Sequence, residues 1–191
     1  MLFMHMELFT YNRTFTLFLT ICLCTVFMSC GEHHKVKRMI SDFSASEIIL
    51  PEELECIYKK QVRPIVKDTL KPYKYIIYYD SYDCSSCRIA KLTDNYPLYS
   101  FADINKISVL TIFSPDEGEL DNVMRQLIIS DLDIPIYVDV NKAFQKQNPS
   151  IPRDMRFHYF LLDNDGKPLL IGNPITSDKI MRLLHNSSLI L

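Results

Sequence analysis

The sequence predicts a single α/β domain with a mixed central sheet and helices on both faces. Two apolar runs at 75–79 and 107–113, rich in β-branched and aromatic residues, are typical of strands buried on both faces of a sheet. An amphipathic helix at 115–130 follows the second run, so strands alternate with helices and lie parallel. Apolar runs on either side of the turn at 163–166 predict an antiparallel hairpin, which makes the sheet mixed.

The composition is that of an ordinary globular domain. The chain has 191 residues, 48% of them hydrophobic and 23% charged, which is enough to bury one core. Its formal net charge is -2 and its aromatic residues are not interleaved with Lys/Arg runs, so nucleic acid is not expected as a partner. Four glycines leave little room for a phosphate-binding loop. No Ser/His/Asp or paired-carboxylate pattern appears either, so the hydrolase and nucleotide-binding classes are excluded.

The N-terminal part of the domain is expected to begin with a short edge strand at 48–50, ended by Pro51. A helix is predicted at 52–61, because two acidic residues stand in its first turn and lysines stand in its last. After the strand at 75–79, a further helix is expected over about 87–96.

The helix at 115–130 has the clearest local signal in the chain. Residues 114–117, with the letters SPDE, read as a capping box with Pro115 at the first helical position. Apolar residues then recur at helical spacing. They are Leu120, Val123, Met124, Leu127 and Ile128.

The C-terminal half continues the alternation of strands and helices. A strand at 134–138 and a short helix at 140–147 precede the hairpin strands at 159–162 and 169–171. A last helix is expected after these strands, capped at its N-terminus by a hydroxyl. The cap is Thr176 or Ser177, and the inner face carries Ile180, Leu183 and Leu184.

The first thirty residues read as an export signal. Residues 14–31 carry no charge, and Arg13 supplies the positive flank of an apolar run with the length of a secretory signal core. The run ends at 27–30 with the letters FMSC, which resemble the lipobox of bacterial lipoproteins. In such proteins the Cys, here Cys30, is acylated and becomes the new N-terminus.

This resemblance divides the chain into a lipoprotein signal peptide at 1–29, a lipidated tether at 30–46 and a folded domain at 47–191, with Cys30 as the lipid anchor. The tether is polar and basic with no apolar period. The alternative is an uncleaved anchor helix with a chance cysteine. Both interpretations place the domain outside the cytoplasm on a membrane of the cell envelope, in the periplasm or at the cell surface.

Cysteine usage indicates one reactive couple. Of six cysteines, two lie in the signal and one at the lipobox, which leaves Cys56, Cys84 and Cys87. In an oxidising compartment this odd number favours a Cys84/Cys87 couple and a solitary Cys56. Cys56 is expected to be a small, buried, hydrophobic residue.

The couple lies in the motif CSSC at 84–87, directly after a predicted strand and at the start of a helix. A strand, a C-x-x-C motif, a βαβ unit and a terminal hairpin with a helix follow one another in the order of a thioredoxin fold. Cysteines three residues apart on one helical turn face the same way, within reach of a disulfide. Cys84, among unpaired helix N–H groups, is the predicted nucleophile, and Cys87, one turn inside, is expected to be shielded and to resolve the mixed disulfide.

From about residue 75 to residue 184 the sequence resembles the membrane-anchored, TlpA-like redoxin lipoproteins of bacteria, which have a thioredoxin-like fold. The inserted strand and helix at 134–147 distinguish this group, and FLLDNDGK at 160–167 matches the strand and turn that end such domains. The resemblance implies thiol-disulfide exchange with Cys84 and Cys87 as catalytic residues, a protein disulfide as substrate and no cofactor. Electrons are expected from an unidentified membrane or periplasmic thiol donor.

Two positions depart from the pattern of that family. Asp83 precedes Cys84 where relatives usually carry Trp, and a carboxylate there disfavours the thiolate and makes the couple more reducing or less reactive. The cis-proline that faces the dithiol in the family corresponds to Phe157, and Pro152 lies five residues earlier. The sequence therefore indicates either a longer loop or loss of the cis-proline.

Two other interpretations of the motif stay open. One is a catalytically silent thioredoxin-like binding module in which Cys84 and Cys87 form a structural disulfide. The other is a copper site in which His158, near the expected cis-proline position, adds an imidazole to the two thiolates. Metal sites usually need more ligands than two thiolates, so no metal is predicted.

Overall fold

The computed structural model describes residues 34–188, so the expected signal peptide and Cys30 lie outside the described residues. Within the described range, no helix is both long enough and apolar enough to cross a membrane. The chain divides into two compact units, and the second unit starts at Asp42, ahead of the boundary expected at 47. This earlier start has a physical reason, because the Phe43 side chain is fully buried in the core of that unit.

Residues 34–44 are helical, within the segment predicted as a tether. The expectation that this segment has no apolar period is wrong, because apolar residues recur at helical spacing between its basic residues. They are Val36, Met39, Ile40 and Phe43.

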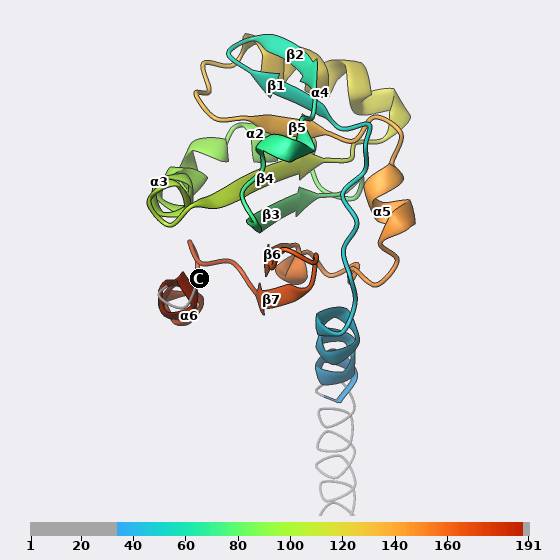
Figure 1. The fold of residues 1–191 in the computed structure, drawn as a ribbon. Helices are drawn as coiled ribbons and strands as arrows, with labels where there is room; N and C mark the ends of the chain where they lie inside the picture. The colour runs from blue at the N-terminus through green and yellow to red at the C-terminus, as the bar shows by residue number, and fades with distance from the viewer. Residues whose placement is uncertain (1–33, 189–191) are drawn as a thin grey trace, which may run out of the picture. The chain divides into compact units, whose positions relative to one another are not determined.

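One seven-stranded sheet forms the centre of the domain (Figure 1). Its strands are β1 (Glu55–Tyr58), β2 (Gln61–Pro64), β3 (Tyr73–Tyr79), β4 (Ile107–Phe113), β5 (Ile136–Val138), β6 (Tyr159–Leu162) and β7 (Pro168–Ile171). The order across the sheet is β2-β1-β5-β4-β3-β6-β7. Strand β4 pairs parallel with β3 and β5, and all other neighbours pair antiparallel, so the predicted mixed sheet is confirmed.

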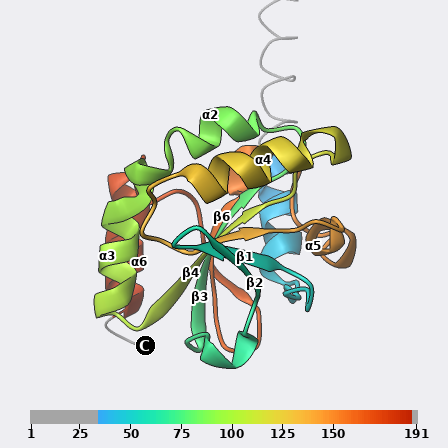
Figure 2. The same ribbon diagram turned by 90° about the horizontal axis from the view of Figure 1, so that it is seen from above.

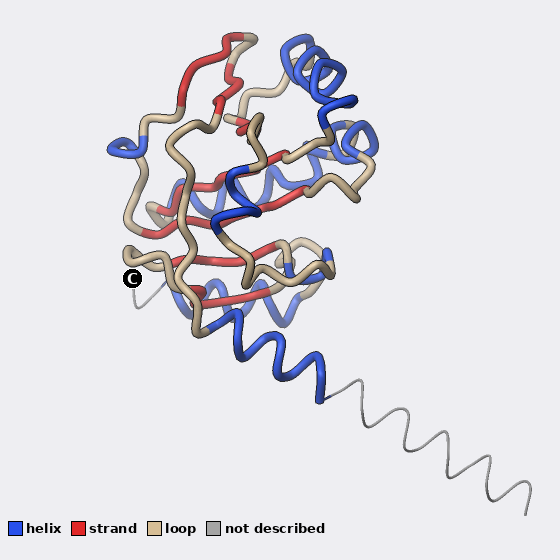
Figure 3. The backbone as a smooth tube through the Cα atoms, turned by 90° about the vertical axis from the view of Figure 1, so that its right-hand side faces the viewer, coloured by secondary structure: helices blue, strands red, loops and turns tan. Residues whose placement is uncertain are grey.

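Helices cover both faces of this sheet, as predicted (Figure 2 and Figure 3). They are α2 (Ser85–Ile89), α3 (Tyr96–Ile104), α4 (Glu117–Ile129), α5 (Ala143–Gln147) and α6 (Asp178–Ser188), with 3-10 turns η1 (Lys67–Thr69), η2 (Leu92–Asn95) and η3 (Met155–Phe157). Side chains of α3, α4 and α6 pack with Tyr75 and Ile77 of β3 on one face. On the other face, Phe144 of α5 packs with Ile76 and Tyr78 of the same strand.

The helix predicted at 52–61 is wrong, since residues 55–64 form the β1–β2 hairpin. Strand β1 also pairs antiparallel with β5, so it is held on both sides. The turn residues Lys59 and Lys60 have positive φ angles of 50° and 63°. Lys60 Nζ lies 2.9 Å from Asp131 Oδ1 in the loop before β5. Lys59 and Lys60, which were predicted to lie in the last turn of a helix, instead form the β-turn between β1 and β2.

The strand expected at 48–50 is not formed. The backbone N–H of Ile49 donates to Asn148 Oδ1 at 2.7 Å, and its carbonyl accepts from Asn148 Nδ2 at 2.8 Å. A side-chain amide thus takes the place that a neighbouring strand would have, and Asn148 itself is buried.

The N-terminus of α4 differs from the predicted capping box. The helix begins at Glu117, with Asp116 as its N-cap residue. Ser114 Oγ donates to Asp139 Oδ2 at 2.6 Å instead of capping α4. Asp139, after β5, is almost fully buried and also accepts from the N–H groups of Ala143 and Phe144, so it caps α5.

We expect Asp139→Ala to lower the free energy of unfolding by about 3 kcal/mol, because three hydrogen-bond donors lose their acceptor. Asp139→Asn is the matched control, since its carbonyl oxygen still accepts from the Ala143 N–H and less stability should be lost. Urea denaturation of both variants measures the difference. A loss for Asp139→Ala no larger than that for Asp139→Asn would contradict this role.

The remaining helices agree in part with expectation. The helix predicted at 87–96 is interrupted, because α2 ends at Ile89 and η2 separates it from α3. Ser177 is confirmed as the cap of α6, since its hydroxyl accepts from the Ile180 N–H at 3.5 Å. On the expected inner face of α6, Leu184 is fully buried whereas Leu183 is 42% exposed.

Candidate functional site

The Cys84–Cys87 disulfide lies just beyond the carboxyl end of β3. The Cα atoms of the two cysteines are 5.2 Å apart. Cys84 is the N-cap residue of α2, and its Sγ accepts a hydrogen bond from the backbone N–H of Cys87 at 3.3 Å. The structure therefore joins the two cysteines that the sequence predicts as a couple.

Both cysteines are exposed to solvent, so the expectation that Cys87 is shielded is wrong. The reason is the orientation of α2, in which Ser85 is the residue that faces the interior. The two sulfurs of the disulfide differ instead in hydrogen bonding. The Cys87 N–H points at Cys84 Sγ and favours negative charge on that sulfur.

Asp83 and Arg88, on either side of the CSSC motif, form an ion pair that sequence reasoning missed. Asp83 is 7% exposed, and its Oδ1 accepts from Arg88 Nε at 3.0 Å and from Nη2 at 2.8 Å. Partial burial lowers the pKa of the Arg88 guanidinium, but the Asp83 carboxylate outweighs this effect and the pKa is raised. The signal for this pair was present in the sequence as opposite charges directly before and after the C-x-x-C motif.

Other elements meet the motif beside this pair. Gln126 Nε2 of α4 donates to Ser86 Oγ at 2.8 Å, so α4 contacts the residues between the cysteines. Tyr82, two residues before Cys84, is 74% exposed, and Met155 of η3 is 42% exposed. Tyr82 thus lies close to the disulfide in sequence, and Met155 Sδ lies 4.0 Å from Nη2 of Arg88, the residue that follows Cys87.

The loop that carries the expected cis-proline position takes another form here. All peptide bonds between residues 34 and 188 are trans, and Phe157 is part of η3. The buried His158 donates from Nε2 to the Pro152 carbonyl at 2.8 Å and packs on the Tyr78 ring. In the described part of the chain, no three His, Cys, Asp or Glu side chains are grouped as a metal site requires.

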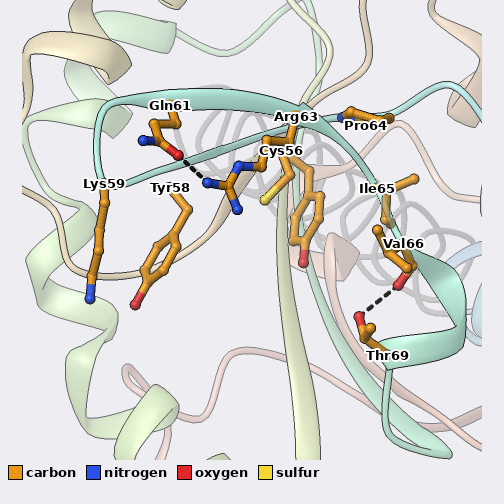
Figure 4. Close-up of a pocket in the computed structure, with 10 residues that line it drawn as sticks. Cys56, Tyr58, Lys59, Gln61, Arg63, Pro64, Ile65, Val66 and Thr69 are labelled. Atoms are coloured by element: carbon orange, nitrogen blue, oxygen red, sulfur yellow. Dashed lines mark hydrogen bonds between the residues drawn. The ribbon is translucent and has the colours of Figure 1, made fainter.

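Cys56 forms no disulfide and lines a pocket of about 510 Å3 at the β1–β2 hairpin (Figure 4). Its side chain is half-buried, so the expected burial is only partial. Burial raises the pKa of the Cys56 thiol, and a hydrogen bond with Tyr137 and the charge of Arg63 offset part of this effect. A raised pKa makes this thiol a weaker nucleophile at neutral pH.

The arrangement of strands and motif defines the class of fold. Strand β3 carries the C-x-x-C motif beyond its carboxyl end, with β4 parallel on one side and β6 antiparallel on the other. The β6–β7 hairpin and α6 then close the domain. This is a thioredoxin-like fold, as the sequence predicts.

One solved structure reaches a TM-score of 0.50 with this chain and supports this class of fold. The chain is similar to a candidate thiol:disulfide interchange protein DsbE from Chlorobium tepidum, with a TM-score of 0.50 and 11% identity over 75% of this chain and 98% of that one. AhpC of Enterococcus faecalis gives a TM-score of 0.47 and 12% identity over 75% and 91% of the two chains. A thioredoxin-like protein from Bacteroides caccae gives a TM-score of 0.47 and 15% identity over 79% of this chain and 53% of that one. At these identities the likeness concerns the fold alone.

No protein-family model matches the sequence, and no curated protein sequence matches it.

Proposed function

We propose that this protein is an extracytoplasmic thiol-disulfide oxidoreductase that acts on protein disulfides through Cys84 and Cys87. The observation that carries the proposal is the exposed disulfide beyond β3 of a thioredoxin-like fold, with the Cys87 N–H directed at Cys84 Sγ. An exposed sulfur that receives a hydrogen bond when charged is suited to attack another disulfide. The interchange description of the Chlorobium tepidum structure points to the same reaction.

The proposed reaction transfers two electrons from the reduced protein to its substrate. The Cys84 thiolate attacks one sulfur of a substrate disulfide, forming a mixed disulfide and releasing the other substrate sulfur as a thiolate that takes up a proton. The Cys87 thiol loses its proton and attacks Cys84 Sγ, which breaks the mixed disulfide and releases the second substrate thiol. The Cys84–Cys87 disulfide is then reduced by a membrane or periplasmic thiol donor.

Equilibration with glutathione tests this function. In buffers of increasing reduced-to-oxidised glutathione ratio, the peptide containing Cys84 and Cys87 should change from disulfide to dithiol, as read by alkylation and mass spectrometry. In a second assay the reduced protein should reduce the disulfides of insulin, and a Cys84→Ser/Cys87→Ser double variant is the control that should not. A disulfide that stays closed in the folded protein under the most reducing buffer would replace this proposal with the silent binding module.

The proposed location rests on the N-terminal sequence. The uncharged run at 14–31 and the FMSC letters at 27–30 support export and acylation of Cys30, which anchors the domain to a membrane. Metabolic labelling with a fatty-acid analogue should mark the wild-type protein and Cys24→Ala, but not Cys30→Ala. Uptake of label by Cys30→Ala equal to that of the wild type would overturn the lipid anchor.

A further inference from the structure

The residue directly before the proposed attacking cysteine carries a buried carboxylate. Asp83 directly precedes Cys84, and its side chain is only 3% exposed, whereas that of Arg88 is 37% exposed. Two nitrogens of Arg88 donate to one oxygen of this carboxylate. Because Arg88 follows Cys87, the ion pair connects the residues on both sides of the CSSC motif.

Contacts with two other elements fix the guanidinium in place. Its Cζ atom lies 5.4 Å from the centroid of the Tyr79 ring on β3. Its Nη2 atom lies 4.0 Å from Met155 Sδ on η3. A planar group with several donors can contact a carboxylate, a ring and a sulfur together, which a lysine ammonium cannot reproduce. The position of the positive charge is therefore set by the fold and does not depend on Asp83 alone.

We propose that Arg88 is a positioning residue that sets the reactivity of Cys84 by compensating the charge of Asp83. The inference rests on the proposed exchange function and names the groups that tune it. An uncompensated carboxylate disfavours a neighbouring thiolate, and burial of the Asp83 carboxylate reduces the screening of this repulsion by water. With Arg88 in place the pair is neutral as a whole, so the hydrogen bond from the Cys87 N–H acts on Cys84 without opposition.

A purely structural role of the ion pair predicts a different result. If the pair only held the CSSC segment in shape, loss of either partner would alter Cys84 in the same direction. If the pair acts through charge, Arg88→Gln leaves an uncompensated anion and Asp83→Asn leaves an uncompensated cation. The two single variants must then have opposite effects, and the double variant must lie near the wild type.

The experiment measures the alkylation rate of Cys84 in the reduced full chain against pH, resolved by peptide mass spectrometry. We expect Arg88→Gln to shift the alkylation profile of Cys84 by about one unit to higher pH, which slows alkylation at neutral pH about tenfold. Asp83→Asn should shift it down by about the same amount. The double variant should lie within about threefold of the wild type, and Arg88→Lys should fall between the wild type and Arg88→Gln.

Matched controls remove one charge from nearby exposed positions. Lys91→Gln and Asp94→Asn should leave the profile within about twofold of the wild type, because charges surrounded by water are screened.

Shifts of Arg88→Gln and Asp83→Asn in the same direction, or an unchanged profile in Arg88→Gln, overturn the inference. If thermal denaturation shows that Arg88→Gln does not fold, Arg88→Lys takes its place. Shifts of Arg88→Lys and Asp83→Asn in the same direction, or an unchanged profile in Arg88→Lys, then overturn the inference. Alkylation needs no disulfide substrate, so glutathione equilibration decides the function and the pH profile decides this inference.

Discussion

A Cys87→Ser variant is expected to accumulate as a mixed disulfide on Cys84 when the reduced protein meets oxidised glutathione, because no thiol remains to resolve it. Cys84→Ser should trap far less. The thiol that remains in this variant, Cys87, lacks the hydrogen bond that Cys84 Sγ accepts from a backbone N–H. A difference of one unit in thiol acidity corresponds to about a tenfold difference in thiolate population, and this is the ratio expected between the two variants at early times.

Intact-protein mass spectrometry measures the trapped fraction, and the Cys84→Ser/Cys87→Ser double variant gives the background from the remaining cysteines. Because both sulfurs are exposed, access to solvent does not produce the expected difference. Equal trapping by the two single variants would remove the assignment of Cys84 as the nucleophile. A wild-type disulfide that dithiothreitol fails to reduce in the folded state would contradict exchange altogether.

Phe160→Ala should produce the largest loss of stability, about 3–5 kcal/mol in the free energy of unfolding. Phe160 is fully buried on β6, and its ring meets that of Phe43 edge-on, with centroids 5.1 Å apart. Its removal leaves a cavity beside β3, because β6 pairs with that strand. Urea denaturation followed by circular dichroism measures the loss.

Two further variants test the origin of this effect. Leu169→Ala on β7, where the side chain is 48% exposed, should cost less than about 1 kcal/mol. Phe43→Ala should cost about 3 kcal/mol, since the same ring contact is lost from the other side. A negligible effect of Phe43→Ala would show that the folded unit does not need the residues ahead of 47.

The strands at the centre of the fold could be predicted because their signal is local. Strand β4 has the bounds expected from its apolar run, and β3 extends the predicted run by two residues. The β1–β2 hairpin could not be predicted in this way. Its acidic and basic residues fit a helix locally, and the pairing of β1 with β2 and with the distant β5 makes the segment extended. Ser114 is a second example. Its hydroxyl was predicted to cap the helix that follows it in the sequence, but it donates to the distant Asp139 instead.

The sequence by itself determined the α/β class, the position of the C-x-x-C motif after a buried strand, and the pairing of Cys84 with Cys87. These properties follow from hydrophobic periodicity and covalent spacing, which act over a few residues. The tertiary structure alone decided that Cys87 is exposed, that Arg88 compensates Asp83, and that Asp139 binds Ser114. Each of these depends on where a helix or side chain comes to lie once distant segments pack together, and such packing outweighs local preference because burial and long-range hydrogen bonds contribute more free energy.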